Sequence, residues 1–460
     1  MMRTWRANAA WLLAALGVAW AAVEKVRGAW AYAVGNSQAS ASDSLPLFLG
    51  AKAVHSGLDP TDPEVLQSVY LAADMQVTKA IFSVLYPPSL HVMLQPLAGL
   101  SHYGFLFYWR LILLGGLVAG LAAAGTVGVK GRRLPLAMAL SVLGAFALFP
   151  LFVGVQLGLG QPNLLIVGLF GLAMGCVARG LPALAALVAV VGAGVKLVPA
   201  VIIWPLLWSR RWRPLAIAVG LGVVLAGLTL VHVPLERIVD NLASTLAFQK
   251  TVEPHWLHDQ GLPTWGRFIG FLRRPSLLIM SLALTAWAVW NNRTDDGRRG
   301  EASAVGMALL ATALAADSTG VGAYYATMAM PGMVAVLTWP LSERRSRGAW
   351  VAWPAVLSIV ALTDGGLIYS TPDVEVRLVL ACSIIWVAVA ARLISLAHPW
   401  TPKAKLVGSG LVLLAVAYAS LWTWRPPFRG HKTLPEAFPG SLTTPESPPV
   451  APIPHDASPR

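Results

Sequence analysis

The chain has 460 residues, of which 56% are hydrophobic and only 12% are charged, and its formal net charge is +13. Soluble domains carry roughly a quarter charged residues, so the composition excludes a water-soluble globular protein. A basic excess can indicate nucleic-acid binding, but here it falls in short connections between apolar runs, where it fixes the orientation of a membrane protein. The two cysteines, Cys176 and Cys382, have no paired spacing, which argues against a disulfide framework or a zinc site.

The apolar runs predict membrane-spanning helices. A helix needs about 20 apolar residues to cross the lipid core, and runs without alternation favour helices over a barrel. We therefore predict an all-α, polytopic membrane protein with roughly 11–13 transmembrane helices. The first run follows Arg3 and Arg6 like a signal peptide, but many spans follow it and no cleavage site is clear, which favours a retained helix. The candidate spans are residues 8–34, 87–100, 104–128, 134–157, 162–178, 181–208, 214–233, 275–291, 302–316, 320–340, 349–369, 376–397 and 405–424.

The connections between these spans are unequal in length and charge. Short basic connections, such as residues 209–213 and 343–347, belong in the cytoplasm by the positive-inside rule. The long connections, residues 35–86 and 234–274, fall on the opposite side, and the first of them is acidic. The basic residues 130–133 fall on the outer side in this count, which points to one miscounted helix.

The predicted organisation is a transmembrane domain over residues 1–424 and a proline-rich, disordered tail over residues 425–460. The two long connections place the mass outside the bilayer on one face. A transporter usually binds its substrate near the midplane. The asymmetry favours chemistry or recognition at the outer surface of the membrane.

Asp43 is the first candidate for catalysis. It follows the first span closely and precedes an amphipathic-looking stretch, residues 45–55, which could lie flat at the interface. A carboxylate held there could act as a general base on a hydroxyl that attacks a lipid-linked substrate. Asp before a short helix is also a common N-cap, so the residue alone leaves both roles open.

Four stretches resemble, in order, the motifs of glycosyltransferase family 87. They are Asp43 with GAKA and GLDP (residues 50–60), Tyr86-Pro87-Pro88, GQPN (residues 160–163) and GVKLVP (residues 194–199). The resemblance implies the GT-C architecture, with a large first outer loop, and transfer of a sugar from a polyprenyl-phosphate donor. The family includes mycobacterial α-mannosyltransferases and arabinofuranosyltransferases, so the implied sugar is mannose or a pentose such as arabinose. The family's catalytic acidic residue lies in the first outer loop, and this role falls on Asp43.

The chain departs from the family's pattern at two places. Thr61 follows Pro60, where the family tends to have an aromatic residue. A late outer loop with Ser-Pro and His-Tyr in the family contains Asp317, Tyr324 and Tyr325 here, without the proline and the histidine. Tyr324 and Tyr325 are therefore candidate substrate-binding residues.

Lys196 and Arg110 are cations inside predicted spans. A cation buried in lipid is costly and suggests a functional partner, for which a phosphate is the natural counter-ion. Either side chain could instead snorkel to the interface, which the aromatic run before Arg110 favours. Gln161 and Asn163 could bind sugar or phosphate, or could hold helices together. Tyr86, in the second motif, joins the candidate substrate-binding residues.

His255, His258 and Asp259 have loose metal-ligand spacing, but no third strong ligand is evident, so we expect no metal and no cofactor. We expect the histidines to line the second outer loop instead, as candidate substrate-binding residues. Trp256 and Trp265 could stack on sugar faces there, although tryptophan is common at membrane interfaces for other reasons.

These assignments combine into an inverting glycosyl transfer at the outer face of the cell membrane, which the chain crosses many times. Asp43 deprotonates the hydroxyl of a lipid or glycan acceptor, which attacks the anomeric carbon, and Lys196 or an arginine stabilises the leaving phosphate. The predicted partners are the polyprenyl-phosphate-linked sugar, this acceptor and membrane lipids, with no nucleic acid. A transporter or flippase of lipid-linked sugars is the alternative, but it needs no long acidic outer loop, and no internal repeat is seen. A non-catalytic scaffold subunit would tolerate replacement of Asp43.

Overall fold

The computed structural model describes residues 2–35, 44–72, 86–196, 198–208, 212–251, 276–318, 323–342 and 372–397. Within these ranges the chain forms sixteen α-helices, five short 3-10 helices and no strand, which confirms the all-α fold class. All these elements belong to one compact unit, Met1–Ser420. The predicted tail, residues 425–460, lies outside the described residues, so the domain organisation stays a prediction.

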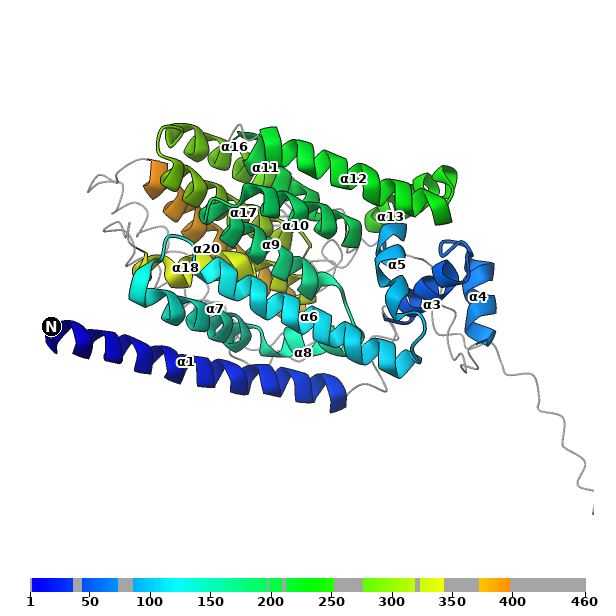
Figure 1. Ribbon diagram of the computed structural model, residues 1–460, viewed down its shortest axis with the longest axis horizontal. Coiled ribbons are helices and arrows are strands. Elements are labelled where there is room, and N and C mark those ends of the chain that lie inside the picture. Colours follow the sequence, from blue (N-terminus) through cyan, green and yellow to red (C-terminus); the bar gives the residue numbers. More distant parts are fainter. Residues whose placement is uncertain are drawn as a thin grey trace, which may run out of the picture. The chain divides into compact units, whose positions relative to one another are not determined.

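The helices form a bundle (Figure 1), and most of them are short and apolar. Helix α6 packs along α9, and α1 packs along α7 and α8. The later helices α16, α17 and α20 pack against one another, and α17 also contacts α9. The α-helices are α1 (Met2–Gly35), α3 (Ser44–His55), α4 (Pro63–Ala72), α5 (Pro88–Leu94), α6 (His102–Gly125), α7 (Leu134–Leu148), α8 (Pro150–Leu159), α9 (Asn163–Ala178), α10 (Pro182–Val195), α11 (Ile203–Trp208), α12 (Trp212–His232), α13 (Leu235–Thr251), α16 (Ser276–Asn291), α17 (Asp296–Ser318), α18 (Met330–Thr338) and α20 (Pro372–Ala397). The 3-10 helices are η1 (Gln95–Leu97), η2 (Gly131–Arg133), η3 (Val198–Ile202), η4 (Ala323–Ala329) and η5 (Trp339–Leu341).

Helices α6 and α9 meet through glycines. A Cβ atom on Gly120 would lie 2.0 Å from the Gly168 carbonyl oxygen, and one on Gly171 would lie 2.3 Å from the Gly120 carbonyl oxygen. Small residues of this kind let two helix backbones approach closely, as in membrane helix pairs. Gly116 contacts Gly168, and Gly120 contacts Gly171, so the two helices run parallel and their N-termini lie at the same end.

Two helices in the described part, α6 and α12, are long and apolar enough to cross a membrane, and the bent pair α7–α8 would count as a third span. Helix α12 also exposes large apolar side chains, among them Val219, Val223 and Val231. Such a surface suits lipid, where a helix satisfies its own backbone hydrogen bonds. The structure therefore indicates a membrane protein.

Among the described residues, four of the predicted spans are not continuous α-helices. In the span 320–340, the described part consists of η4, the nine-residue α18 and part of η5. Residues 87–100 form only α5, with seven residues, and η1, and seven helical residues extend only about 10 Å. Residues 134–157 bend by 81° between α7 and α8, because Pro150 has no N–H to continue the hydrogen bonds of α7. Residues 181–208 break at Lys196, whose backbone is extended (φ −161°, ψ 143°).

The short α5 explains why residues 130–133 were placed on the wrong side. Counting it as a span placed residues 130–133 on the outer side. Because α6 and α9 run parallel, residues 130–133 and Arg179 follow their helices at the same end. Gly300, near the start of α17, lies at the same end, since a Cβ atom added to it would lie 3.0 Å from the Val177 carbonyl oxygen. We call this the basic end, and the positive-inside rule predicts that it is cytoplasmic.

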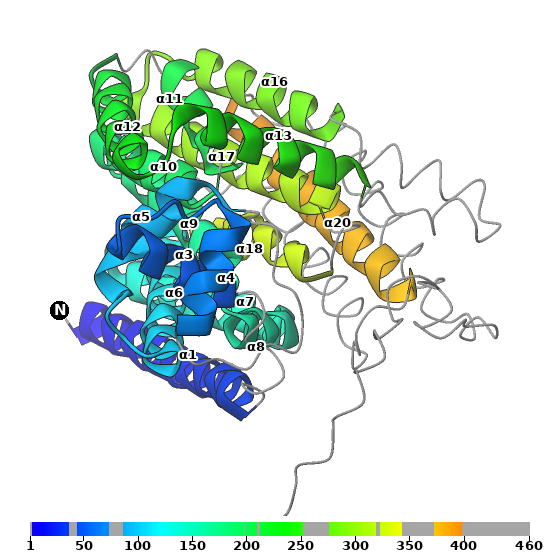
Figure 2. The ribbon, with the colours of Figure 1, turned by 90° about the vertical axis from the view of Figure 1, so that its right-hand side faces the viewer.

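The opposite end, which we call the loop end, contains the N-termini of α6 and α9 and the helices α3, α4 and α5 of the first long connection. Figure 2 looks onto these three helices. The amphipathic-looking stretch of residues 45–55 forms most of α3, and its position at the membrane interface stays a prediction. Helix α3 is largely buried, including Phe48 and Ala51, because α4, α5 and α6 pack around it. Gly50 of α3 packs against the ring of His91 in α5, where a Cβ atom would clash.

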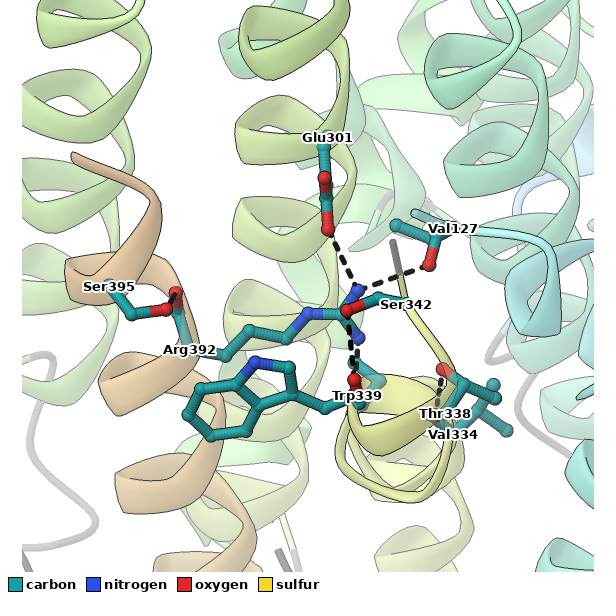
Figure 3. Close-up of polar contacts among 9 residues, drawn as sticks. Val127, Glu301, Val334, Thr338, Trp339, Ser342, Arg392 and Ser395 are labelled. Atoms are coloured by element: carbon teal, nitrogen blue, oxygen red, sulfur yellow. Dashed lines mark hydrogen bonds and ion pairs between the residues drawn. The ribbon is translucent and has the colours of Figure 1, made fainter. Parts of the chain in front are cut away.

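A buried ion pair joins four segments at the basic end (Figure 3). Nη2 of Arg392, in α20, lies 3.0 Å from Oε1 of Glu301, in α17, and donates to the Val127 carbonyl oxygen at 3.0 Å. Nη1 donates to the carbonyl oxygen of Ala335, in α18. Only 1% of the Arg392 side chain and 7% of the Glu301 side chain are exposed. Gly128 makes room for the pair, since its φ of +73° favours glycine and a Cβ atom would lie 2.3 Å from Glu301.

Candidate functional site

The turn between α8 and α9 forms the centre of the candidate site at the loop end. Gly160 ends α8 in the left-handed conformation, with φ of 72°, and α9 begins at Asn163. A Cβ atom on Gly160 would lie 2.7 Å from the Cβ atom of Ser44. Both the backbone angle and the lack of space therefore require glycine here. The turn places Gln161 and Asn163, both buried, beside the first long connection.

Two consecutive residues of α6 hold this turn. Nε1 of Trp109 donates to the Gly160 carbonyl oxygen at 2.7 Å. Nε of Arg110 donates to the Leu157 carbonyl oxygen and Nη2 to the Gly158 carbonyl oxygen, both at 2.8 Å. The structure thus places Arg110 on the carbonyl groups at the C-terminus of α8, with only 5% of the residue exposed.

The polar residues of three sequence motifs meet in one chain of contacts. The Tyr86 hydroxyl lies 3.5 Å from Oε1 of Gln161, at the long limit for a hydrogen bond. Nδ2 of Asn163 donates to the same oxygen at 3.3 Å, and Nζ of Lys196 donates to Oδ1 of Asn163 at 3.2 Å. A phenol, two amides and an ammonium group therefore lie together, although they come from segments far apart in the sequence. Such a set can bind both an anion and hydroxyl groups.

Lys196 owes its position to the break after α10. Its backbone nitrogen donates to the Gly192 carbonyl oxygen at 2.9 Å, closing the last turn of α10, and the extended backbone then leaves the helix. Ser89 of α5 supports this turn, because its hydroxyl donates to the Gly194 carbonyl oxygen at 2.8 Å. Irregular backbone at membrane depth is tolerated where it lies within protein or lines a cavity. The half-buried Lys196 side chain is consistent with that placement.

Asp43 lies outside the described residues, but the residue after it is part of the site. Ser44 begins α3, is fully buried and contacts Gly160. The other aspartates of this connection have structural partners. Oδ1 of Asp59 accepts hydrogen bonds from the backbone and hydroxyl of Thr61, at 2.8 and 2.6 Å. Oδ1 of Asp62 accepts from the backbone nitrogen at the start of α4, at 2.9 Å.

The two long connections meet at the loop end. Oδ2 of Asp62 lies 3.6 Å from Nη2 of Arg237, in α13. His255 and His258, with Asp259, Trp256 and Trp265, lie outside the described residues, so their predicted place in the second loop is untested. No group of metal-binding side chains occurs among the residues that the structure describes.

The late segment reaches the site through Gln156. Its side-chain Nε2 donates to the Thr327 hydroxyl at 2.7 Å, and its backbone carbonyl oxygen accepts from the backbone nitrogen of Gln161 at 2.9 Å. Thr327 belongs to η4, which also contains Tyr324 and Tyr325, whose side chains are not described. The sequence interpretation missed Gln156, although an amide within an apolar run was a visible signal. It also missed Ser89 and Trp109, whose roles depend on backbone carbonyls that a sequence does not display.

The comparison with protein families agrees with this assembly of motifs. The family model of glycosyltransferase family 87 matches residues 84–316, slightly more than half of the 460 residues. The comparisons with curated proteins and with solved structures gave no match. The matched range includes Tyr86, Gln161, Asn163 and Lys196 and begins after Asp43. The chain belongs to glycosyltransferase family 87 and is a membrane glycosyltransferase.

Proposed function

We propose that this protein transfers a sugar from a polyprenyl phosphate to a lipid or glycan acceptor at the outer face of the cytoplasmic membrane, which the chain crosses several times in a GT-C-like arrangement. The observation that carries the proposal is the contact chain of Tyr86, Gln161, Asn163 and Lys196 at the loop end. An ammonium group suits the donor phosphate, and amide and phenol groups suit sugar hydroxyls.

In the proposed reaction, Asp43 accepts the proton of the acceptor hydroxyl as its oxygen attacks the anomeric carbon of the donor. The new carbon–oxygen bond forms as the bond from that carbon to the phosphate oxygen breaks, so the configuration at carbon inverts. Polyprenyl phosphate leaves with the electron pair, and Lys196 stabilises its charge. The position of Ser44 against Gly160 supports this assignment, because Asp43 is its neighbour in the chain.

The family's range of activities suggests mannose or a pentose such as arabinose as the sugar. His255 and His258 of the second long connection and Tyr324 and Tyr325 of the late segment remain our candidates for contacts with the sugar or the acceptor. The salt bridge between Asp62 and Arg237 supports a role for the second connection, because it brings α13 to the loop end.

The decisive experiment compares Asp43→Asn with the matched control Asp59→Asn. Purified protein in detergent is incubated with radiolabelled polyprenyl-phosphate mannose or arabinose and a membrane lipid extract. General-base catalysis is worth about 10²–10⁴-fold, so transfer by Asp43→Asn should fall by at least about 100-fold. The melting temperature should stay within a degree or so of wild type, because Asn caps a helix about as well as Asp.

Asp59→Asn should keep most of its activity, because an amide oxygen can still accept the hydrogen bonds from Thr61. Near-normal transfer by Asp43→Asn, or a larger loss at Asp59, would show that another carboxylate is the base. Unchanged movement of lipid-linked sugar across vesicles together with no transfer in any variant would favour the flippase alternative.

A further inference from the structure

Arg110 is a buried cation that the proposed reaction does not use. Its guanidinium group donates to the carbonyl oxygens of Leu157 and Gly158, and 5% of the residue is exposed. Among the described residues, no carboxylate forms a salt bridge with it. A charge within a membrane protein that lacks an opposite charge usually serves a substrate or an ion.

The carbonyl groups that Arg110 contacts form the negative end of a helix. The C-terminus of α8 carries a partial negative charge of about −0.5 from its unpaired carbonyl groups, whereas the N-terminus of α9 carries about +0.5. The two helix ends face the same turn, since α8 ends at Leu159 and α9 begins at Asn163. An anion beside Gln161 and Asn163 would be attracted by α9 and repelled by α8. Arg110 neutralises the repulsive end and leaves the attractive end unchanged.

We propose that Arg110 is a positioning residue for the donor phosphate, which acts through the C-terminus of α8 without touching the ligand. Its positive charge makes the turn of residues 158–163 favourable for an anion, and its two hydrogen bonds hold the turn that presents Gln161 and Asn163. This inference rests on the proposed function in one respect only, namely that the ligand of Lys196 is a phosphate. It explains why a cation lies two helical turns inside α6, where an apolar residue would cost less.

The test uses two probes that share one tail, farnesyl phosphate and farnesol, with the full-length protein in detergent micelles. Affinity is measured by titration calorimetry or by competition against donor transfer. A charge near a helix terminus changes the electrostatic potential at that terminus, so Arg110→Gln should weaken farnesyl phosphate binding about tenfold. Farnesol binding should not change. Arg110→Lys keeps the charge and should bind farnesyl phosphate within about threefold of wild type.

Several outcomes would overturn the inference. Unchanged phosphate affinity in Arg110→Gln would show that the charge is not used. An equal loss for both probes, or a loss in Arg110→Lys as large as in Arg110→Gln, would show a structural role only. If Arg110→Gln does not fold, the comparison of the two probes in Arg110→Lys decides, because charge alone should then preserve the preference for phosphate.

Lys196→Met separates this inference from the proposed function. If Lys196→Met binds farnesyl phosphate as tightly as wild type, Lys196 does not hold a phosphate and the proposed function fails. If Lys196→Met weakens binding while Arg110→Gln does not, only the role of Arg110 fails. Lys196→Arg is the matched control and should retain most of the affinity, since it keeps the charge in the same break after α10.

Discussion

Two arginines are buried in the described part of the chain, and they lie near opposite ends of α6. Arg392 at the basic end contacts a carboxylate and two backbone carbonyl oxygens. Arg110 at the loop end contacts two backbone carbonyl oxygens and, among the described residues, no carboxylate. The first arginine is thus neutralised by its own protein, and the second is neutralised only partly, by the negative end of a helix.

This difference separates structural charge from functional charge. Charge within lipid is expensive, so a chain retains it either in a pair or for a ligand. The Glu301–Arg392 pair joins α17, α18, α20 and the segment after α6, and each of its two charges is compensated by the other. The loop end places Arg110 beside a turn built from two helix ends. We therefore expect the basic end to govern stability and the loop end to govern activity.

The largest effect is expected when Glu301→Gln breaks the ion pair with Arg392 at the basic end. Removing one partner of a buried ion pair typically costs about 3–5 kcal/mol, because the other charge stays buried without compensation. Thermal unfolding in detergent should therefore occur at a much lower temperature. Transfer activity per folded molecule at low temperature should remain close to wild type. The double variant Glu301→Gln with Arg392→Met should recover most of the lost stability, because no charge is left to bury.

A loss of activity per folded molecule in Glu301→Gln that matches the loss in Asp43→Asn would remove the distinction between the two ends. A double variant no more stable than Glu301→Gln would show that the hydrogen bonds of Arg392 matter more than its charge.

Acid should act on the loop end through His91, with a somewhat smaller effect. Helix α5 is too short to span a membrane, and burial lowers the pKa of His91 to about 4 from an ordinary value of 6.5, against a weaker, opposing contact with the Leu47 backbone. The folded state therefore keeps this imidazole neutral, while the unfolded chain takes up a proton below pH 6.5. Its stability contribution is complete above that pH and is lost as the pH falls towards 4, by about 3 kcal/mol in all.

The measurement is the free energy of unfolding as a function of pH for wild type and His91→Leu. The variant should lose most of the dependence between pH 6.5 and pH 4, while His55→Leu, at an exposed position in α3, should keep it. Equal slopes in wild type and His91→Leu would show that other groups cause the acid sensitivity.

The sequence predicted the all-α membrane class and the motif residues of the site, because both depend on composition and on residue type at short spacing. Apolar runs cannot show a break, however, when both halves are equally apolar. The bend at Pro150 and the break at Lys196 were therefore missed, although proline was visible at the first and Pro199 near the second. The break after α10 places Lys196 beside Asn163. The sequence therefore did not predict the helix break on which the candidate site depends.

Convergence of the motifs also could not be predicted. Nothing in the sequence indicates that Tyr86 lies near Gln161, since that contact requires α5 to end short of a span. The anchoring of the turn by Trp109 is hidden for another reason. Its partner is the carbonyl group of Gly160, which every residue type would supply. Side-chain identity predicts which groups can bind a ligand, and the backbone decides which of them meet.

The smallest of the expected effects tests the packing of α6 against α9, the helix pair that runs between the two ends. In Gly120→Ala the new Cβ atom would lie 2.0 Å from the Gly168 carbonyl oxygen, so α6 and α9 must move apart. Overpacking of this kind costs about 1–3 kcal/mol. Gly115→Ala, on the same helix, meets nothing within 4 Å and should be neutral or slightly stabilising, since Ala favours a helix.

Because Trp109 and Arg110 hold the site turn from α6, a displaced α6 should also lower transfer by Gly120→Ala, whereas Gly115→Ala should leave it unchanged. The two variants are compared by thermal unfolding and by transfer rate in the same detergent. A loss of stability in Gly120→Ala with full activity would mean that the structure of the loop end does not depend on the packing of α6 against α9. The two ends would then be separate units joined by α6, and the glycines would serve packing alone.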